Sequence, residues 1–570
     1  GPSINIVPRT RGNTFQGSAF IDSVRDWMVG SNLWAALIDR GLRRSGDIET
    51  LWDYNLGVGG PIAKNRVWFF SVVRDQGAYR SIPGMYANNN AGDPAKRTYE
   101  ADLDRPARGA GNWRTISLRL TNQMTARNRV GIFWDEQIPC HGGSWAPGVV
   151  ACRVPKGKYV LGGSPGSSSP FSTATIAPEA SSYSGGNHLR VQQGTWTSPL
   201  SSRVLFETGY GTYINYWGGY EIPGNPTRDI VRVVEQCTRG CPANGGIAGL
   251  TYRSQNWANN VQKMRNWRAS LSYVTARHSL KFGYQGAFHF TNGNPFTNTH
   301  NLQYRVDNGV PNQLTQNMSG SYITKNRVWS NAVYAQEQWT IGRMTYQGAL
   351  RYDYAYSYFP EQRIGANRFL HTDLVIPRTI GVTGFHDLTP RGGVAWDLFG
   401  DGKTALKINA GRYLQNAVAD QLYSGTNPLG DIPLSVTRSW IDANDNFSPD
   451  CSLVNLGQQD LRSAGGDFCG TVSELNFGTP DPSVTYDPAL LGGWGVRPGD
   501  WQFGASVQQE VLPRVSVEAG YYRRWLVNFS VEDNLAVTPA DFDTFTVRVP
   551  DDPRLPTAGQ TISGLYDVKP

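Results

Sequence analysis

Cysteine is the residue type whose spacing in this chain predicts the most definite chemistry. The six cysteines form three pairs that are close in sequence, and each pair lies in a long segment without strand periodicity. The pairs are Cys140 with Cys152, Cys237 with Cys241, and Cys451 with Cys469. An even number of cysteines in exposed loops is typical of an oxidising compartment, so we expect three disulfides. The alternative is zinc, because His141 follows Cys140, but no second cluster of matching spacing accompanies any pair.

Oxygen-bearing side chains alternate in residues 442–450 in a way that could hold a calcium ion. The candidate ligands are Asp442, Asn444, Asn446 and Asp450. Their alternation resembles the start of a calcium-binding loop. Phe447 stands where that pattern needs glycine, however, and the closing glutamate is absent. A plain Asn/Asp turn without a metal is therefore the favoured interpretation.

Aromatic side chains in the long segments could contact a ligand. The candidates are Trp145, Tyr159, Trp217, Tyr220, Trp257 and Trp440. The alternative is that these rings pack the segments against one another, and the sequence favours neither interpretation. No catalytic arrangement accompanies them, because the seven histidines are scattered and no GxSxG, HExxH or Walker motif occurs. We expect a protein that is not an enzyme.

The segments that must position these side chains alternate in polarity and fall into seven pairs. The pairs are residues 49–59/66–73, 112–124/129–136, 189–197/203–213, 266–275/279–290, 331–340/344–354, 389–398/404–413 and 501–510/515–524. Two to four residues join the members of most pairs, whereas the spans between pairs are mostly long. One end of the sheet therefore has short turns and the other has long loops. This layout is typical of an outer-membrane β-barrel.

Each strand has one polar and one apolar face, because successive side chains point to opposite sides. We expect the polar set to face the barrel interior: Thr115, Ser117, Arg119, Gln347 and Arg351. We expect the apolar set to face lipid: Ile116, Leu118, Leu120 and Leu350. A soluble β-sandwich gives the same alternation. The aromatic content of 12%, with many rings near strand ends, favours a membrane barrel with interfacial girdles.

Charge and hydropathy exclude two other classes of protein. The net charge of +7 comes from basic residues that are scattered, often at turns, and form no single stripe, so we expect no nucleic-acid partner. No run of 18 apolar residues occurs, which argues against a helical membrane span.

The first residues do not form a signal peptide. An outer-membrane protein needs one, so we expect that it was removed or that the sequence begins late.

Several stretches resemble TonB-dependent outer-membrane receptors of the Oar-like branch. They are residues 4–18, 59–70, 389–404, 534–542 and 564–567. Residues 4–18 resemble the passage from the plug domain into the first barrel strand, so the resemblance implies the end of a plug at 1–12 and a β-barrel at 13–570. Residues 567–570 lack the aromatic end that is usual in the family. With about 16 or 17 strands in the sequence against 22 in such barrels, we expect an incomplete barrel without its C-terminal strands.

The expected fold is thus all-β, a transmembrane antiparallel β-barrel that forms part of a 22-stranded one. The resemblance implies a receptor in the outer membrane of a Gram-negative bacterium that takes up a bulky extracellular solute. Its implied partners are the TonB energy-transducing complex and outer-membrane lipid. A passive porin and a surface adhesion or assembly protein are the alternatives. The substrate cannot be read from the sequence.

Overall fold

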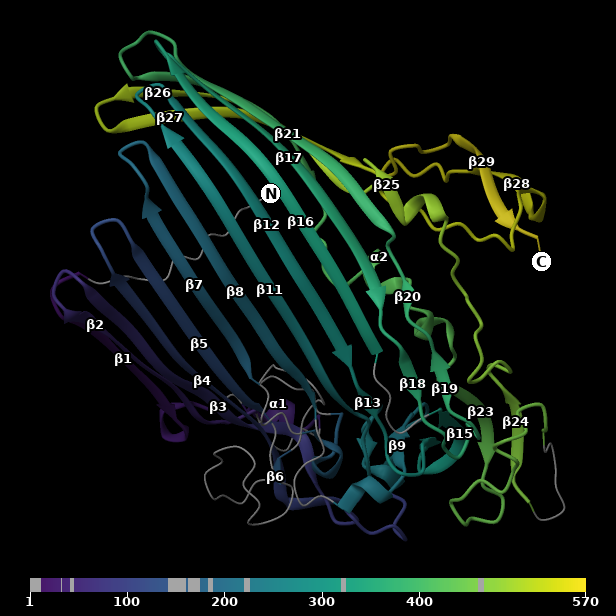
Figure 1. The fold of residues 1–570 in the computed structure, drawn as a ribbon. Helices are drawn as coiled ribbons and strands as arrows, with labels where there is room; N and C mark the ends of the chain where they lie inside the picture. Colours follow the sequence, from purple (N-terminus) through teal and green to yellow (C-terminus); the bar gives the residue numbers. More distant parts are fainter. Residues whose placement is uncertain are drawn as a thin grey trace.

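The computed structural model describes residues 12–569, apart from residue 32 and segments 41–45, 142–159, 162–174, 183–187, 220–225, 319–323 and 460–465. Its main element is a broad, curved antiparallel sheet (Figure 1). Its long strands follow one another in chain order, and each pairs with the one before it. They are β1 (Gln16–Arg25), β2 (Ile48–Ala63), β3 (Val67–Asn88), β4 (Ala101–Gln123), β5 (Arg129–His141), β7 (Leu189–Pro199), β8 (Val204–Gly219), β11 (Trp257–Val274), β12 (His278–Gly293), β16 (Thr324–Ile341), β17 (Met344–Phe359), β21 (Gly384–Asp397), β22 (Thr404–Leu414), β26 (Gly499–Leu512) and β27 (Val515–Val527).

All seven hairpins predicted from the alternation are confirmed, and their strands run further toward the loops than expected. The segment predicted as 66–73 is part of β3, which has 22 residues, and β4 has 23. A tilted strand needs only about 9–11 residues to cross a bilayer. These strands are therefore long enough to continue well beyond the lipid. Short strands extend the sheet at the loop side: β6 (Val160–Leu161), β13 (Pro295–Phe296), β20 (Thr379–Ile380) and β25 (Gly492–Trp494).

The predicted separation into a polar and an apolar face is confirmed. Cross-strand pairing places Ser117 and Arg119 on the same face as Arg351. On the other face, Ile116 and Leu350 are 49% and 52% exposed, as side chains directed at lipid would be. We call the polar face the inner face and the apolar face the outer face.

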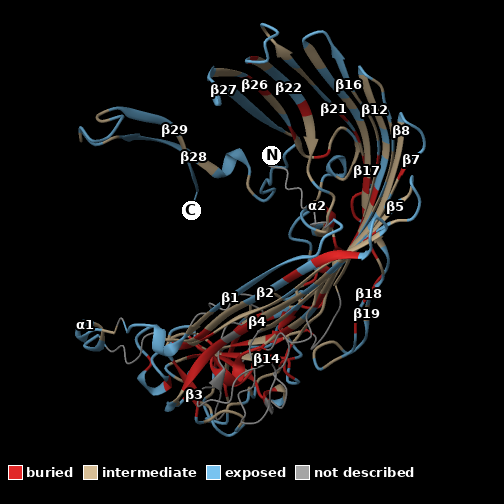
Figure 2. Ribbon diagram, turned by 90° about the vertical axis from the view of Figure 1, so that its left-hand side faces the viewer, coloured by how far each residue is buried: buried red, intermediate tan, exposed pale blue. Residues whose placement is uncertain are grey.

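The sheet is open. In the part of the chain that the structure describes, β1 pairs only with β2 and β27 pairs only with β26, at the two ends of the curved sheet (Figure 2). Unpaired N–H and C=O groups in lipid cost several kcal/mol each. A closed barrel in a membrane therefore requires further strands between β27 and β1. Strands β28 (Phe542–Arg548) and β29 (Thr561–Val568) do not supply this closure, because they form a separate hairpin.

The long loops, which show no strand periodicity in the sequence, build a second sheet. Its strands, in spatial order, are β10 (Thr251–Tyr252), β9 (Arg232–Glu235), β14 (Leu302–Asp307), β15 (Val310–Asn317), β23 (Ser435–Ile441) and β24 (Phe468–Val472). These strands come from three loops, and the pairs β9–β14 and β15–β23 join one loop to another. We call this sheet and the segments packed on it the loop layer. A smaller pair, β18 (Gln362–Ile364) with β19 (Leu374–Ile376), comes from the loop after β17.

The largest buried apolar cluster lies in the loop layer, where Figure 2 shows most of the buried residues below the sheet. Its members include Tyr252, Val306, Leu314 and Trp440, each with no exposed surface. The loops therefore hold one another through a common core. Short helices occur among them and elsewhere: η1 (Asp26–Met28), α1 (Ala35–Ile38), η2 (Pro178–Ala180), η3 (Pro226–Asp229), η4 (Pro242–Asn244), α2 (Leu422–Gly425), η5 (Pro428–Asp431), η6 (Pro488–Leu490) and η7 (Pro539–Asp541). No helix within the described ranges is long and apolar enough to cross a membrane.

Candidate ligand-binding wall and its loop layer

A cavity of about 560 Å³ lies against the inner face of the main sheet, and we call it the wall cavity. Strands from β7 to β21 form one side of it, and the chain that follows β22 forms the other. The side chains that give it its chemistry are Gln193, Thr195, Asn266, Arg268, Gln285, Arg351, Asp353, Arg391, Gln415, Asn416 and Arg497. The lining is therefore polar, as alternation in the strands requires of a lumen wall.

Positive charge dominates this lining. Four arginines face the cavity together with one carboxylate, that of Asp353. The Nε atom of Arg351 donates to both oxygens of Asp353 at 3.0 and 2.9 Å, and its Nη1 donates to Gln285 at 2.6 Å. Arg351 is thus held in place by a carboxylate two residues away on the same face of β17. Within the described residues, the other three arginines form no ion pair with a carboxylate.

Those three arginines are Arg268, Arg391 and Arg497. The guanidinium of Arg391 lies 4.3 Å from the centre of the Tyr413 ring, a cation–π contact that orients it. Arg497 is 5% exposed, donates through Nη2 to the carbonyl of Gln415, and leaves its Nε atom buried without a hydrogen-bond acceptor in the described protein. Guanidinium groups bind carboxylates and phosphates through paired hydrogen bonds. The wall cavity is therefore suited to an anionic group.

The chain from 415 to 426 turns onto the inner face after β22, and we call it the inward segment. The N–H of Ala419 donates to Nδ1 of His289 at 2.9 Å. Tyr423, in α2, packs edge-on against Phe385 with ring centres 5.9 Å apart, in a cluster that includes Val328. His289 and Val328 are cross-strand partners on the inner face. The inward segment is thus fastened to the barrel wall and closes one side of the wall cavity.

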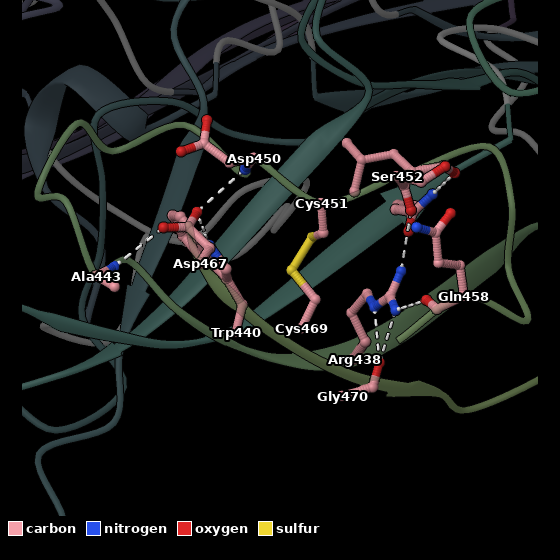
Figure 3. The surroundings of a disulfide bond; sticks show 12 residues. Arg438, Trp440, Ala443, Asp450, Cys451, Ser452, Gln458, Asp467, Cys469 and Gly470 are labelled. Carbon is pink, nitrogen blue, oxygen red and sulfur yellow. Dashed lines mark hydrogen bonds between the residues drawn. A yellow bond between two sulfur atoms is a disulfide. The ribbon is translucent and has the colours of Figure 1, made fainter. Parts of the chain in front are cut away.

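A disulfide and two buried charged side chains, Arg438 and Asp467, hold strands β23 and β24 together at one edge of the loop layer (Figure 3). Cys451 is joined to Cys469. On one side of this bond, the guanidinium of Arg438 is 2% exposed and donates to the carbonyl oxygens of Gly470, Ser452 and Gln458. A charge without a carboxylate partner is tolerated there because carbonyl oxygens take up its donors.

On the other side, Asp467 is 1% exposed and accepts three hydrogen bonds. The donors are Nε1 of Trp440 at 2.8 Å and the N–H groups of Ala443 at 3.0 Å and Asp450 at 3.1 Å (Figure 3). These three donors satisfy the buried carboxylate oxygens, so burial of this polar group leaves no acceptor without a partner. Together with Arg438, Asp467 fixes the ends of the covalently closed loop 451–469.

The structure separates the predicted ligand-contacting aromatics into two groups. Trp440 is fully buried with its ring centre 4.6 Å from that of Tyr304, and Trp257 is 3% exposed and stacked on Phe296 at 5.7 Å. These two rings pack within the loops in this structure, and ligand contact by any of the candidate aromatics stays a prediction. Trp217 is 46% exposed at the end of β8, and its partner Asn260 places it on the inner face. Trp145, Tyr159 and Tyr220 lie outside the described residues.

Two of the three expected disulfides are present in the structure. They are Cys237–Cys241 and Cys451–Cys469, with Cα atoms 5.0 and 6.2 Å apart. Cys140, at the end of β5, is disulfide-bonded, and its expected partner Cys152 lies outside the described residues. All of these cysteines are on the loop side of the main sheet.

The candidate calcium ligands form a turn whose oxygens accept hydrogen bonds from the turn itself. Asp442 accepts from the N–H groups of Asn446 at 3.0 Å and Phe447 at 2.7 Å, and Asn444 donates through Nδ2 to Asp450 at 2.5 Å. A guanidinium nitrogen of Arg97 lies 4.0 Å from Asp442. No group of three or more His, Cys, Asp or Glu side chains suited to a metal occurs in the described ranges. A turn without a metal stays the favoured interpretation, and calcium binding is its untested alternative.

Sequence reasoning missed several residues of the wall, among them Arg268, Arg391, Arg497 and His289. Arg268 and Arg391 could have been found, because each, like Arg351, is an arginine at an inward-facing position of a predicted strand. Arg497 and His289 carry no comparable signal. Arg497 reaches the wall from the end of a loop that follows β25, and His289 is recognisable only through its contact with Ala419. Tertiary placement, rather than periodicity, brings these side chains together.

A sequence profile of the outer membrane beta barrel domain family matches residues 158–557. The chain therefore belongs to this family of outer-membrane β-barrel proteins, as its open sheet of alternating strands and its one-sided loops lead one to expect. No curated protein matches the chain significantly.

Solved structures of outer-membrane proteins are similar to it at low sequence identity. The outer membrane transporter YddB from Escherichia coli is 14% identical, with 90% of this chain and 52% of that chain covered and a TM-score of 0.49. The ferric yersiniabactin uptake receptor FyuA from Yersinia pestis is 9% identical, with 90% and 55% covered and a TM-score of 0.44. The chain thus spans little more than half the length of these two proteins.

Proposed function

We propose that the protein is a TonB-dependent receptor that takes up a bulky, anionic solute across the outer membrane. The observation that carries the solute class is the wall cavity with three arginines that lack a carboxylate partner in the described residues. The TonB dependence rests on the resemblance of residues 4–18, 59–70 and 389–404 to such receptors. The wall cavity is lined mainly by polar side chains, as a path for a hydrated solute needs to be.

The loop end of the inner face and the wall cavity would act in sequence on the solute. Trp217 stands exposed on the inner face at the loop end of β8, where an arriving solute meets a ring with both an apolar body and a polar tip. The arginines of the wall cavity lie further along the same face. A solute would thus pass from aromatic contact at the mouth to charge-assisted hydrogen bonds inside.

Binding of a charged peptide to the purified protein tests the solute class. The probe is a fluorescein-labelled tetraglutamate peptide, followed by fluorescence anisotropy beside tetraglutamine and tetralysine peptides. We expect tetraglutamate to bind most tightly. Replacing Arg268→Gln and Arg391→Gln together should weaken its binding at least tenfold for each arginine, since a hydrogen bond to a charged group contributes about 1.5–3 kcal/mol.

The matched control removes the same amount of charge from the inner face outside the wall cavity. Arg119→Gln with Lys407→Gln serves this purpose, because both side chains share the inner face and neither lines the cavity. The control variant should bind tetraglutamate within about twofold of the unmodified protein. Equal binding of the three peptides, or equal weakening in both double variants, would contradict the anionic class.

A further inference from the structure

Cationic and aromatic side chains alternate in a row across the outer face of the main sheet. The row consists of Tyr216 on β8, Lys263 on β11, Phe290 on β12, Arg327 on β16, Tyr358 on β17 and Arg378 just before β20. We call it the cation–aromatic row. Each cation lies over a neighbouring ring, at 5.4 and 5.5 Å for Lys263 over Tyr216 and Phe290. The distances are 4.9 Å for Arg327 over Phe290 and 4.7 Å for Arg378 over Tyr358.

Strand register places the row on the outer face. Lys263 is the cross-strand partner of Phe290, Phe290 of Arg327, and Arg327 of Tyr358, so these four side chains project from one side of the sheet. The next residues along β12 and β16, His289 and Val328, project from the other side and contact the inward segment. The row therefore faces away from the lumen.

The same face becomes apolar toward the short turns. Leu271, Phe282, Val333 and Leu350 project from it and are 42%, 54%, 52% and 52% exposed. Lys263 precedes the end of β11 at Val274 by 11 residues. A strand rises about 3.3 Å per residue. With a tilt of about 45° the row lies about 25 Å above the turns, at the edge of an apolar band of about that height. This is the level of the lipid head groups on the loop side.

The described residues do not balance the charges of the row. Arg327 donates through Nη1 only to uncharged acceptors, which are the carbonyl oxygens of Thr291 and Asn326 and Oδ1 of Asn292. Within the described residues, Lys263, Arg327 and Arg378 form no ion pair with a carboxylate. Arg190 shows the contrast, because on the same face it is paired with Glu136 at 3.1 Å and lies 4.9 Å from the ring of Trp134. Charged side chains on a lipid-facing surface are costly unless they reach the interface and a counter-charge.

We propose that the cation–aromatic row is a binding site for the phosphate-bearing head groups of lipids in the loop-side leaflet. The lysine and the guanidinium groups would hold phosphate oxygens, and the rings between them would support the adjoining glycerol or sugar. The row spans five neighbouring strands, so one or two lipids bound along it would bridge those strands. This site is independent of the solute and of the wall cavity, because it lies on the opposite face.

The test compares the thermal stability of the complete protein, with its barrel closed, in nanodiscs of phosphatidylcholine with that in nanodiscs containing phosphatidylglycerol. Unmodified protein should have the higher Tm with phosphatidylglycerol, and Lys263→Gln with Arg327→Gln should abolish the difference. Titration of phosphatidylglycerol into protein in neutral detergent should show an affinity about thirtyfold lower in this variant, since each cation near an anionic surface contributes about 1 kcal/mol. The control pair Arg119→Gln with Lys407→Gln, on the inner face, should retain the full difference.

Glycerol 3-phosphate in place of lipid separates a lipid site from a simple phosphate site. The proposal expects no stabilisation by glycerol 3-phosphate at concentrations where phosphatidylglycerol acts. Equal stabilisation by both compounds would overturn the lipid assignment. Loss of the phosphatidylglycerol effect in the inner-face control as well, or its persistence in the row variant, would overturn the site itself.

Discussion

Two tryptophans that the sequence does not distinguish differ in the structure, because one is buried and the other is exposed. Trp440 and Trp217 both stand in segments between predicted strands, and the sequence gives no basis for separating them. In the structure Trp440 fills the core of the loop layer and Trp217 is exposed on the inner face. Burial depends on which other loop covers a ring. For Trp440 that cover includes Tyr304, more than a hundred residues away in the chain.

Replacing these two tryptophans should therefore have different consequences. Trp440→Ala leaves a large cavity and removes the donor to Asp467, so we expect the loop layer to lose about 3–5 kcal/mol of stability. Trp217→Ala should leave stability within about 0.5 kcal/mol while weakening solute binding. Chemical denaturation followed by limited proteolysis of the loops measures the first effect. A stability loss of similar size in both variants would contradict this assignment.

A buried carboxyl group should make the stability of the loop layer depend on pH. Glu179 is 1% exposed and accepts from Nδ2 of Asn88 at 2.7 Å, and burial raises the pKa of its carboxyl group above the ordinary 4.5. The folded protein thus keeps this proton where the unfolded chain has released it. Its contribution to stability is greatest below pH 4.5 and falls as the pH rises through the range between the unfolded and folded pKa values.

Glu179→Gln should remove that part of the pH dependence. Relative to unmodified protein, the variant should gain stability as the pH is raised from 4 toward 8, because glutamine carries no charge to bury. Denaturation midpoints of the loop layer across this pH range provide the measurement. Parallel pH profiles for the two proteins would show that Glu179 does not titrate differently on folding.

At the scale of elements, local sequence was sufficient for the main sheet and insufficient for the loop sheet. Hairpins such as β16–β17 pair strands that are adjacent in sequence, so alternation and a short turn predict both strands and their register. Strands β9 and β14 pair in parallel, from different loops, and β9 has only four residues. Short strands whose partners lie far away in the chain leave no periodic signal. The two disulfides could be predicted because their cysteines are near in sequence.

The Cys451–Cys469 disulfide should stabilise the loop layer. The bond closes a loop of 18 residues, for which chain entropy gives about 3 kcal/mol. Cys451→Ser with Cys469→Ser should lower the stability of the loop layer by that order and expose the segment between them to protease. Cleavage at an unchanged rate would mean that Arg438 and Asp467 hold this loop without the covalent bond.

Single cysteines on one strand can test the two faces of the main sheet. Gln347 and Leu350, on β17, lie on the inner and the outer face. In lipid bilayers, Gln347→Cys should react with a water-soluble maleimide, and Leu350→Cys should react only after the protein is denatured. Equal labelling of both positions in intact bilayers would contradict a lipid-facing outer surface. The native cysteines provide the background level, measured in protein without an added cysteine.

At the scale of the whole molecule, an open, curved sheet carries the loop layer at one end and the wall cavity on its inner face (Figures 1 and 2). Alternation predicted the polar wall, including Arg351, but not the cavity itself. The cavity depends on the turn of residues 415–426 onto the wall. The spacing of polar and apolar residues in that segment does not distinguish it from an external loop. Its direction is set by contacts such as Ala419 with His289.

Energised uptake is the central claim, and transport in whole cells tests it most directly. The complete protein would be produced in the outer membrane of cells that lack other receptors, and entry of labelled anionic peptides into the periplasm would be followed. We predict uptake that is lost when TonB is deleted or when the proton gradient is collapsed, and that is reduced by Arg268→Gln with Arg391→Gln. Uptake that is indifferent to both TonB and the gradient would identify a passive porin, and the absence of any uptake would leave only a surface-interaction role.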